Sequence, residues 1–352
     1  MSPSDYLAST FSIIGFDPDA QEWGVAVQSK AFSVGAMVPW AQAGVGAIAT
    51  QAWTNKSFGL RGLQLLKRGH DPKDVIQHLI ESDKGGARRQ LAVMDVQGRA
   101  ANYTGNECMK WAGGIAEPNV SVQGNILAGE RVITNMLRAF KNDSDTNRTR
   151  RKLGERLIAA LEAGQKAGGD TRGQQSASLL VVREKSDIDG IGDVYVDVRV
   201  DDHTTPLVEL RRLYGIWEKQ MYPYLEGQRI NLLLRAKKYA RAQKLHREFS
   251  AHAERLARKN WNDADLLNNL AWQFAQNALG LDAAYKYAQR ATKLKPQDAN
   301  IADTLAEVHF QRGDAARAIK IERVLVSKQP ERADFKTQLE KFEKAARTAR
   351  RT

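Results

Sequence analysis

The chain has 352 residues, a formal net charge of +12, 42% hydrophobic residues and one cysteine. This length suits two domains with conventional cores, and the hydrophobic content excludes a disordered or collagen-like chain. A single cysteine excludes an internal disulfide framework and favours a reducing, cytoplasmic compartment. We expect no secretory signal, because no basic segment precedes an apolar one near the start, and no membrane span, because no run of about 18 apolar residues occurs.

The charge is unevenly placed along the chain. Residues 1–215 hold 26 Lys and Arg against 25 Asp and Glu, whereas residues 216–352 hold 27 against 16. The basic character therefore belongs to the second part. This excess predicts an acidic partner for that part, not an anionic substrate for the first.

Apolar, β-branched segments separated by turn residues predict strands in the first part, with helical segments between them. The predicted strands are 10–16, 24–28, 44–50, a hairpin over 90–103, 120–122, 177–182 and 194–200. The predicted helices are two within 59–80, the second opened by Asp71 and Pro72, and one each over 126–140 and 153–163. This succession predicts an α+β fold, for which two sheets flanked by helix layers are one solution. Small residues dominate 44–50, which predicts close packing of another layer over that strand.

After about residue 206 the pattern is helical throughout and contains a repeat. Pro296 and Pro330 lie 34 residues apart. An alanine lies 12 residues before each of them, Ala284 before Pro296 and Ala318 before Pro330. A 34-residue unit with small residues where two helices touch is typical of tetratricopeptide repeats. The first copy carries one extra residue, and a degenerate earlier copy starts near Leu232.

The repeat module predicts binding of a partner protein in a concave groove. Its basic character predicts an acidic protein or peptide there, and the absence of an aromatic RNA-binding strand signature argues against nucleic acid. We also expect a homo-oligomer. A final helix over 333–347 would cap the repeats.

The first part lacks phosphate-binding, dinucleotide-binding and serine-hydrolase motifs, and its histidines have no metal-ligand spacing. We therefore expect no metal and no organic cofactor. Polar residues set among glycines remain as candidates for chemistry. They comprise Thr10, Gln28–Lys30, Thr50–Trp53, Val120–Gly129 and Gly168–Ala177.

Seven blocks of residues carry a family resemblance: Ser9–Ile13, Gly35–Ala41, Ala43–Ala47, Ala49–Ala52, Val122–Gly129, Gly168–Ser176 and Val198–His203. Together they resemble the bacterial domain-of-unknown-function family 1028, which is placed with the N-terminal nucleophile (Ntn) hydrolases. The resemblance covers about residues 9–212 and implies a four-layer αββα sandwich. It divides the chain into a leader over 1–9, an Ntn-like domain over 10–212 and a repeat domain over 213–352.

Ntn hydrolases use a Thr, Ser or Cys whose own α-amine, with a pKa of about 7.7–8.0, is the general base. The resemblance implies that Thr10 is this nucleophile once residues 1–9 are removed. The other implied site residues are Ser29 and Lys30 beside the nucleophile, Gln123 and Asn125 at the oxyanion, Asp170 and Ser176 at the amine, Arg172 at a substrate carboxylate, and Gln51 at the substrate.

Each of these residues also has a structural interpretation. Thr10 is a β-branched strand residue, Lys30 a solvated charge at a strand end, and Asn125 a turn residue. Asp170 and Arg172 could be structural partners of each other.

A second pair of residues is an alternative nucleophile and base. Cys108 with His203 would form such a pair, whereas the structural interpretation of Cys108 is a small buried hydrophobic residue.

The sequence thus predicts an amidohydrolase acting on a small amide or peptide-like substrate, with a basic repeat module for partner binding. The alternative is a non-catalytic, ligand-binding sandwich domain that acts as a scaffold through its repeats. An uncut leader would favour this alternative.

Overall fold

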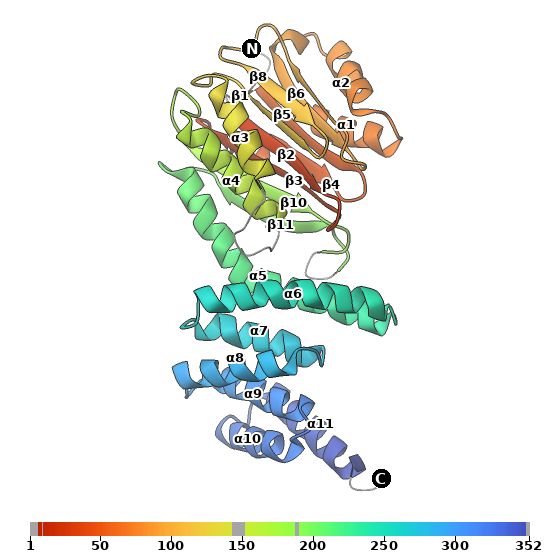
Figure 1. Cartoon of the computed structure of the whole chain (residues 1–352), viewed down its shortest axis with the longest axis vertical. Helices are drawn as coiled ribbons and strands as arrows, with labels where there is room; N and C mark the ends of the chain where they lie inside the picture. The colour runs from red at the N-terminus through yellow and green to blue at the C-terminus, as the bar shows by residue number, and fades with distance from the viewer. Residues whose placement is uncertain (1–5, 9, 143–151, 187–189, 350–352) are drawn as a thin grey trace. The chain divides into compact units, whose positions relative to one another are not determined.

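The computed structural model describes residues 6–8, 10–142, 152–186 and 190–349. The chain divides into two compact units that meet between Gly215 and Ile216. Helix α5 (Pro206–Arg235) begins in the first unit and ends in the second. A mixed strand-and-helix region followed by an all-helical repeat region was expected, and both are present (Figure 1).

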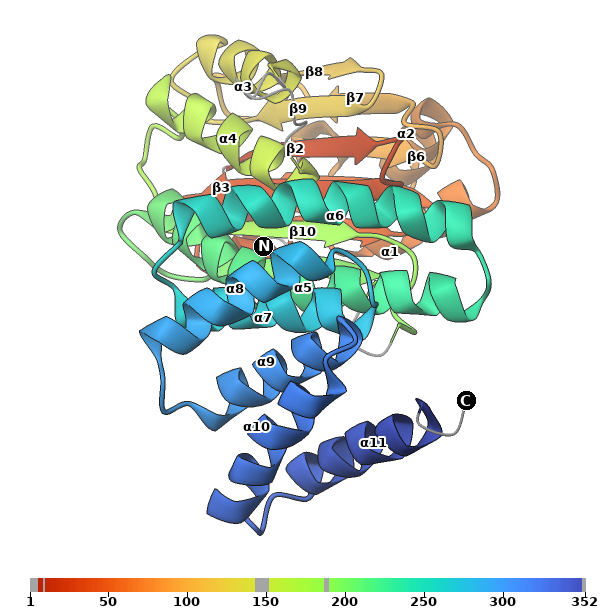
Figure 2. The same ribbon diagram turned by 60° about the horizontal axis from the view of Figure 1, so that its bottom comes forward.

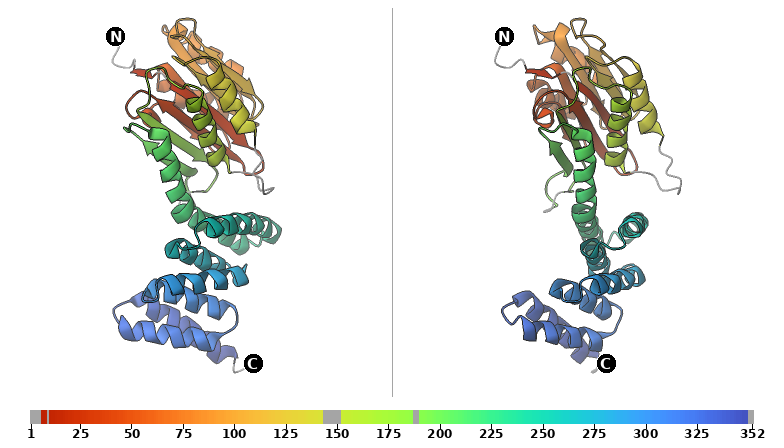
Figure 3. Two further views of the ribbon diagram at one scale, coloured as in Figure 1. Left: turned by 60° about the vertical axis from the view of Figure 1, so that its left-hand side comes forward. Right: turned by 90° about the vertical axis from the view of Figure 1, so that its left-hand side faces the viewer.

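A six-stranded antiparallel sheet forms one layer of the first unit, in the order β11-β10-β3-β2-β9-β8. Its strands are β2 (Thr10–Asp17), β3 (Glu22–Ser29), β8 (Gly113–Glu117), β9 (Val120–Gly124), β10 (Ser176–Val182) and β11 (Val194–Val200). Helices α3 (Arg131–Lys141) and α4 (Leu153–Lys166) lie side by side against it (Figure 3). Every residue of β2 and β3 is buried, because both faces of these central strands are covered.

The second sheet has five strands, with β1-β5-β6-β7 in order and β4 also paired to β5. These strands are β1 (Tyr6–Ala8), β4 (Pro39–Gln42), β5 (Gly46–Thr54), β6 (Arg89–Asp95) and β7 (Ala100–Thr104). Helices α1 (Ser57–Lys67) and α2 (Pro72–Glu81) cover its outer face, where Ile48 and Val93 join the apolar side chains of both helices. The first unit also contains two short 3-10 helices, Val34–Ala36 and Gly86–Arg88.

The inner faces of the two sheets meet in an apolar core. Phe16 and Trp23 stack there with ring centroids 4.7 Å apart, and the Trp23 indole N–H donates to the carbonyl of Asp95 in the other sheet. Ala47 and Ala49 of β5 lie opposite these rings in the same cluster. Their small size lets the sheets approach, as the composition of residues 44–50 predicted.

Several elements of the first unit differ from the sequence prediction. Strands β1, β4 and β8 were not predicted, and β1 lies in the segment that was expected to be only a leader; residues 1–5 and 9 of that leader lie outside the described residues. The helix predicted over 126–140 begins at Arg131. Ile126 and Gly129 have φ angles of 53° and 150°, which are incompatible with a right-handed helix.

The second unit is a series of antiparallel helices (Figure 2). After α5 they are α6 (Tyr239–Lys259), α7 (Ala264–Gln276), α8 (Leu281–Leu294), α9 (Ala299–Gln311), α10 (Ala315–Lys328) and α11 (Ala333–Ala349). Helices α7, α9 and α11 start 35 and then 34 residues apart. No helix among the described residues is both long enough and apolar enough to cross a membrane.

The helix pairs confirm where the repeat signature placed its small residues. Ala284 and Ala318 are fully buried, in α8 and α10. The extra residue lies in the turn between α7 and α8, which is one residue longer than the turn between α9 and α10. The earlier copy expected near Leu232 corresponds to the end of α5, which holds Leu232, and the start of α6, where Ala242 is fully buried.

The last repeat buries two carboxyl groups beside each other. Burial raises the pKa of Glu322 to about 8 and that of Asp303 to about 6, and the nearby charges of Glu307 and Asp334 act in the same direction. Both Glu322 oxygens are buried, and the group they meet for a hydrogen bond is the Asp303 carboxyl, which can supply one only when a proton lies between the two. A proton shared between Glu322 and Asp303 is therefore the favourable arrangement.

We predict that the helical unit loses stability as pH rises. The pKa of Glu322 is near its ordinary value of 4.5 in the unfolded chain but about 8 in the folded one, so the folded state holds the extra proton between these values. The free energy of unfolding should fall across this window by at most about 1.4 kcal/mol per pH unit. Urea unfolding at several pH values measures it, and Glu322→Gln should flatten the slope. The exposed Glu340→Gln is the control, and an unchanged slope in the Glu322 variant would contradict the prediction.

A second prediction concerns the contact of α3 and α4 with the six-stranded sheet. A Cβ added at Gly15 would lie 2.8 Å from two ring atoms of the buried Phe140 and 3.1 Å from Leu157. Gly15→Ala should therefore lower the free energy of unfolding by about 1–3 kcal/mol in urea titrations. Gly215→Ala, where a Cβ meets nothing within 4 Å, should be neutral or stabilising because the site is helical. Equal effects of both substitutions would contradict the close contact.

Candidate functional site

Thr10 lies at the start of β2, where the chain enters the six-stranded sheet from β1 of the other sheet. Its side chain is fully buried, and its hydroxyl donates to Ser29 Oγ at 3.3 Å. The Thr10 carbonyl accepts from the main-chain N–H of Asn125 at 3.0 Å and from Gln51 Nε2 at 3.4 Å. The structure thus brings Thr10, Ser29, Gln51 and Asn125 together.

Gln90, at the start of β6, connects these residues between the two sheets. Its Oε1 accepts from Gln51 Nε2 at 2.7 Å and from Asn125 Nδ2 at 2.9 Å. Its Nε2 donates to Thr104 Oγ1 at 2.9 Å and to the carbonyl of Gly124 at 2.8 Å. Gln90 thereby satisfies both ends of its amide within the protein interior.

A second branch starts at Ser12 of β2. The Ser12 hydroxyl donates to Gln51 Oε1 and accepts from Gln123 Nε2, each at 2.6 Å. Gln123 Oε1 in turn accepts from Ser121 at 2.9 Å. We call Ser12, Gln51, Gln90, Thr104, Ser121, Gln123 and Asn125 the amide network.

The amide network shares the space between the sheets with the apolar core. Ser12 alternates with Ile14 and Phe16 on β2, so all three side chains point to the same face of that sheet. One end of the interface is therefore polar and the other apolar. The sequence prediction included Gln51, Gln123 and Asn125 but missed Gln90, Ser12 and Thr104. The sequence feature that could have identified them is the placement of polar residues at every second position of buried strands.

The contacts of Asn125 differ from those expected of an oxyanion-binding residue. Its main-chain N–H donates to the Thr10 carbonyl, and its Nδ2 donates to Gln90. Gln123 is likewise bonded at both ends of its amide. These residues hold the start of β2 in place.

The loop that follows α4 lies beside this site. Asp170 is buried and pairs with the Arg172 guanidinium at 3.0 Å, while its carboxylate also accepts the main-chain N–H of Lys30 at 3.3 Å. Lys30 Nζ donates to the carbonyl of Gln174 at the surface. The structural partnership of Asp170 and Arg172 is therefore present.

Ser176, at the start of β10, fixes the loop that follows β3. Its hydroxyl donates to the carbonyl of Ala31 and accepts from the N–H of Val34 at 3.1 Å. The next residue upstream, Gln175, donates its main-chain N–H to the carbonyl of Ser29. Ser176 thus acts on the position of Ser29 through the backbone.

Cys108 and His203 make separate contacts. The Cys108 thiol is buried and donates to the carbonyl of Arg89 at 3.4 Å, and burial raises the pKa of this thiol. His203 is exposed, and its Nδ1 accepts from the N–H of Thr205 at 3.0 Å. A raised pKa makes the thiolate scarcer at neutral pH, which disfavours Cys108 as a nucleophile.

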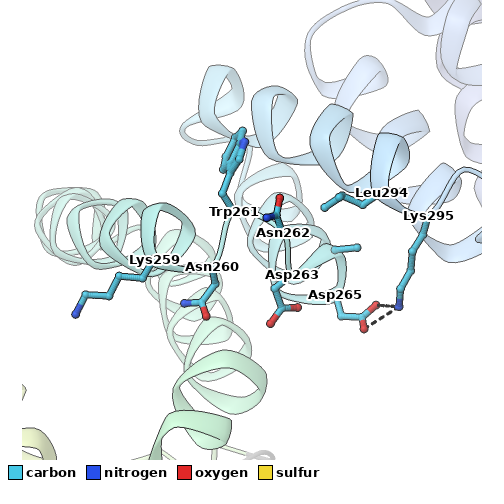
Figure 4. Close-up of a pocket in the computed structure, with 9 residues that line it drawn as sticks. Lys259, Asn260, Trp261, Asn262, Asp263, Asp265, Leu294 and Lys295 are labelled. Atoms are coloured by element: carbon cyan, nitrogen blue, oxygen red, sulfur yellow. Dashed lines mark hydrogen bonds and ion pairs between the residues drawn. The ribbon is translucent and has the colours of Figure 1, made fainter.

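Metal ligation finds no support in the part of the chain that the structure describes, where no cluster of three or more His, Cys, Asp or Glu side chains could hold an ion. A cavity of about 570 Å³ in the helical unit lies where α6, α7 and α8 meet (Figure 4). Its Lys295 points to Asp265 at 2.7 Å, and its Asp263 pairs with Lys219 and accepts the N–H of Leu266. Lys295, Asp265 and Asp263 are thus paired within the protein, and none of them is left to act on a ligand.

A family comparison covers most of the first unit. The model of a family of unknown function, DUF1028, matches residues 10–210. A crystal structure of a protein of that family from Silicibacter pomeroyi has a TM-score of 0.54 and 32% identity, covering 61% of this chain and 91% of that one. No curated protein matches.

Two tetratricopeptide (TPR) domains are also similar to the chain. The second TPR domain of human RPAP3, solved in complex with an HSP70 peptide, is 19% identical with a TM-score of 0.24, covering 34% of this chain and 92% of that one. The Sgt2 TPR domain of Aspergillus fumigatus is 16% identical with a TM-score of 0.25, covering 38% and 84%.

We predict that Gln90→Leu destabilises the first unit by about 3 kcal/mol or more. The substitution leaves several buried donors and acceptors without partners, and each unsatisfied group costs roughly 1–3 kcal/mol. Thermal and urea unfolding measure the loss. Gln77→Leu is the matched control, because Gln77 is exposed on α2 and bonds only to Glu81 among the described contacts. A Gln90 variant as stable as this control would refute a structural role for the amide network.

Proposed function

The chain belongs to the family of unknown function DUF1028, and we propose that its first unit is an Ntn-type αββα hydrolase that cleaves amide bonds through Thr10. The substrate class is a small amide or a peptide-like molecule. The observation that carries the proposal is the position of Thr10. It is the first residue of a central strand, its hydroxyl contacts Ser29, and its carbonyl is held from two sides.

The leader bears directly on this proposal. Tyr6–Ala8 pair with Thr54–Ala52 of β5, so the chain before Thr10 runs as an edge strand of the opposite sheet. While the Ser9–Thr10 peptide bond is intact, Thr10 has no α-amine and its side chain is fully buried. Cleavage of this bond would supply the base beside the hydroxyl. The uncut chain is therefore the inactive form in this proposal.

The reaction then follows from the two groups of one residue. The Thr10 hydroxyl attacks the substrate carbonyl carbon, and the Thr10 amine takes the hydroxyl proton and delivers it to the leaving nitrogen. The C–N bond breaks, the amine product departs, and an ester on Thr10 remains. A water molecule, deprotonated by the same amine, then attacks this ester and releases the acid.

The neighbouring residues have positioning roles in this scheme. Gln51 and Asn125 hold the Thr10 carbonyl, and Ser29 fixes the hydroxyl. Asp170 holds the segment after β3 through the N–H of Lys30, and its charge is paired with Arg172. Arg172 is one-third exposed and is the group that would meet a substrate carboxylate.

A specific observation favours a second, non-catalytic function. Thr10 is fully buried in the chain as it stands, and the surrounding amide network is internally bonded. The first unit would then be a ligand-binding domain that the helical repeats connect to a partner protein. The two functions differ in whether the Ser9–Thr10 bond is cut.

We predict that protein released with Thr10 as its first residue hydrolyses amides and that the full chain does not. A cleavable fusion placed directly before Thr10 supplies the first form, and intact mass verifies both. Thr10→Ala should abolish turnover in a panel of acyl-amide substrates by about a thousandfold or more, because the nucleophile is lost. Thr10→Ser should retain part of the turnover.

Cys108→Ser is the control, and we expect normal turnover from it because the thiol is buried with a raised pKa. Normal turnover by the Thr10→Ala variant would place the nucleophile elsewhere. A Thr10-initiated protein that binds ligands but hydrolyses none of the panel would support the scaffold function.

A further inference from the structure

We propose that the helical unit binds an acidic peptide segment of a partner protein at the basic turn between α5 and α6 and in the cavity beside it, between α5 and α7. This inference rests on the proposed partner-binding role of the helical unit and is independent of the hydrolase proposal. Two observations carry it, one from charge and one from the shape and chemistry of the cavity.

The first observation is a cluster of cations without counter-charges. Residues 235–247 contain six Lys and Arg and no Asp or Glu. The six are Arg235, Lys237, Lys238, Arg241, Lys244 and Arg247. We call them the basic turn. All are exposed, and none forms an ion pair within the described residues, although arginines elsewhere in the unit pair with acids, as Arg323 does with Glu343.

Part of the basic turn lies where cations are costly for the fold. Helix α6 begins at Tyr239, and its first turn holds no acidic residue, so Arg241 and Lys244 lie near the positive end of the helix dipole. Acidic residues stabilise that end and cations destabilise it. The dipole of α5 accounts for Arg235, which lies in the last turn of that helix, but intramolecular stability does not account for Arg241 and Lys244, whereas an anionic ligand would.

The second observation is a cavity of about 290 Å³ that opens beside the basic turn. Tyr224, Gln228, Asn231 and Arg235 lie on one stripe of α5, at helical spacings of four, three and four residues. Arg235 belongs to both the stripe and the basic turn, so the two features are continuous.

The opposite wall of the cavity comes from α7. Trp272 and Gln276 lie there one turn apart, and α5 approaches α7 closely at Gly227, where a Cβ would lie 2.1 Å from Gln273 Oε1. Asn277 Nδ2 closes this end by donating to the carbonyl of Gly227 at 3.1 Å. The cavity is therefore a formed feature of the helical unit.

The chemistry of the cavity favours a peptide as the occupant. Side-chain amides both donate and accept, so Asn231 and Gln276 match the alternating N–H and C=O groups of an extended backbone. Gln228 keeps its Oε1 as an acceptor, while its Nε2 donates to the Tyr224 hydroxyl. Trp272 and the half-exposed Leu232 supply an apolar contact for one side chain. Glutamates or aspartates that flank this side chain would then reach the basic turn. Nucleic acid is the other polyanion that these six cations could attract, so it enters the test as a competing ligand.

Fluorescence anisotropy of a labelled peptide with a central leucine flanked by glutamates tests the proposal on the full chain. Reversing three charges of the basic turn (Lys238→Glu, Arg241→Glu and Lys244→Glu) should weaken binding by about tenfold or more. Trp272→Leu should also weaken peptide binding, but it should change the salt dependence of binding less than the charge reversals do, because it removes no charge. The matched control reverses the charges of Lys320, Lys328 and Lys336 and therefore has the same net charge as the basic-turn variant. These three lysines are exposed and form no ion pair within the described residues.

The outcomes distinguish the proposed peptide site from the partner-binding role of the helical unit. Equal weakening by both triple variants would overturn the site, because attraction to the general positive field would then explain binding. Binding that neither the basic-turn variant nor Trp272→Leu changes would also overturn the site but leave a partner-binding role standing. No binding of the peptide, or tighter binding of an oligothymidylate of equal length, would overturn the acidic-peptide proposal itself. Amide hydrolysis by the Thr10-initiated form is measured separately, so its success or failure bears on neither result.

Discussion

The contact between the two sheets of the first unit is the constraint on which the candidate site depends. Alanines 47 and 49 let the sheets approach, and the stacked rings of Phe16 and Trp23 fill the apolar end. At the other end, amide side chains fill the space between the sheets. A buried amide avoids a large free-energy cost only when its oxygen and its NH2 group are both hydrogen-bonded. The spacing of the sheets thus dictates that the amide network be complete, and Thr10 is held by it.

Bonding within the network explains why polar residues occupy so much of a buried interface. Gln90 connects three strands and the turn after β9, and loss of any one partner leaves others unsatisfied. Such a network specifies one register between the sheets, because a shift of one residue would place apolar side chains against the amides. The position of the Thr10 hydroxyl is therefore set by interactions from both sheets.

The sequence predicts the central strands well because their apolar runs are long, and it predicts the repeat because Pro296 and Pro330 mark its period. It does not predict β1, β4 and β8, since these short strands exist only through pairing with β5 and β9. For the site, Thr10, Gln51 and Asn125 follow from their glycine-rich surroundings and the family resemblance. Gln90 does not, because its role depends on which strand faces it across the core. The basic turn is visible in the sequence as charge, but its continuity with a cavity depends on α5 and α7 lying together.

The passage of the chain from β1 directly into β2 has a consequence for acid–base chemistry. A cut before Thr10 would replace a neutral peptide N–H by a titratable amine in a dry part of the protein, next to a fully buried side chain. Removal from water disfavours the ammonium form and so lowers the pKa of such an amine. The packing that conceals the hydroxyl before the cut would afterwards keep its neighbouring amine unprotonated at neutral pH, ready to accept a proton.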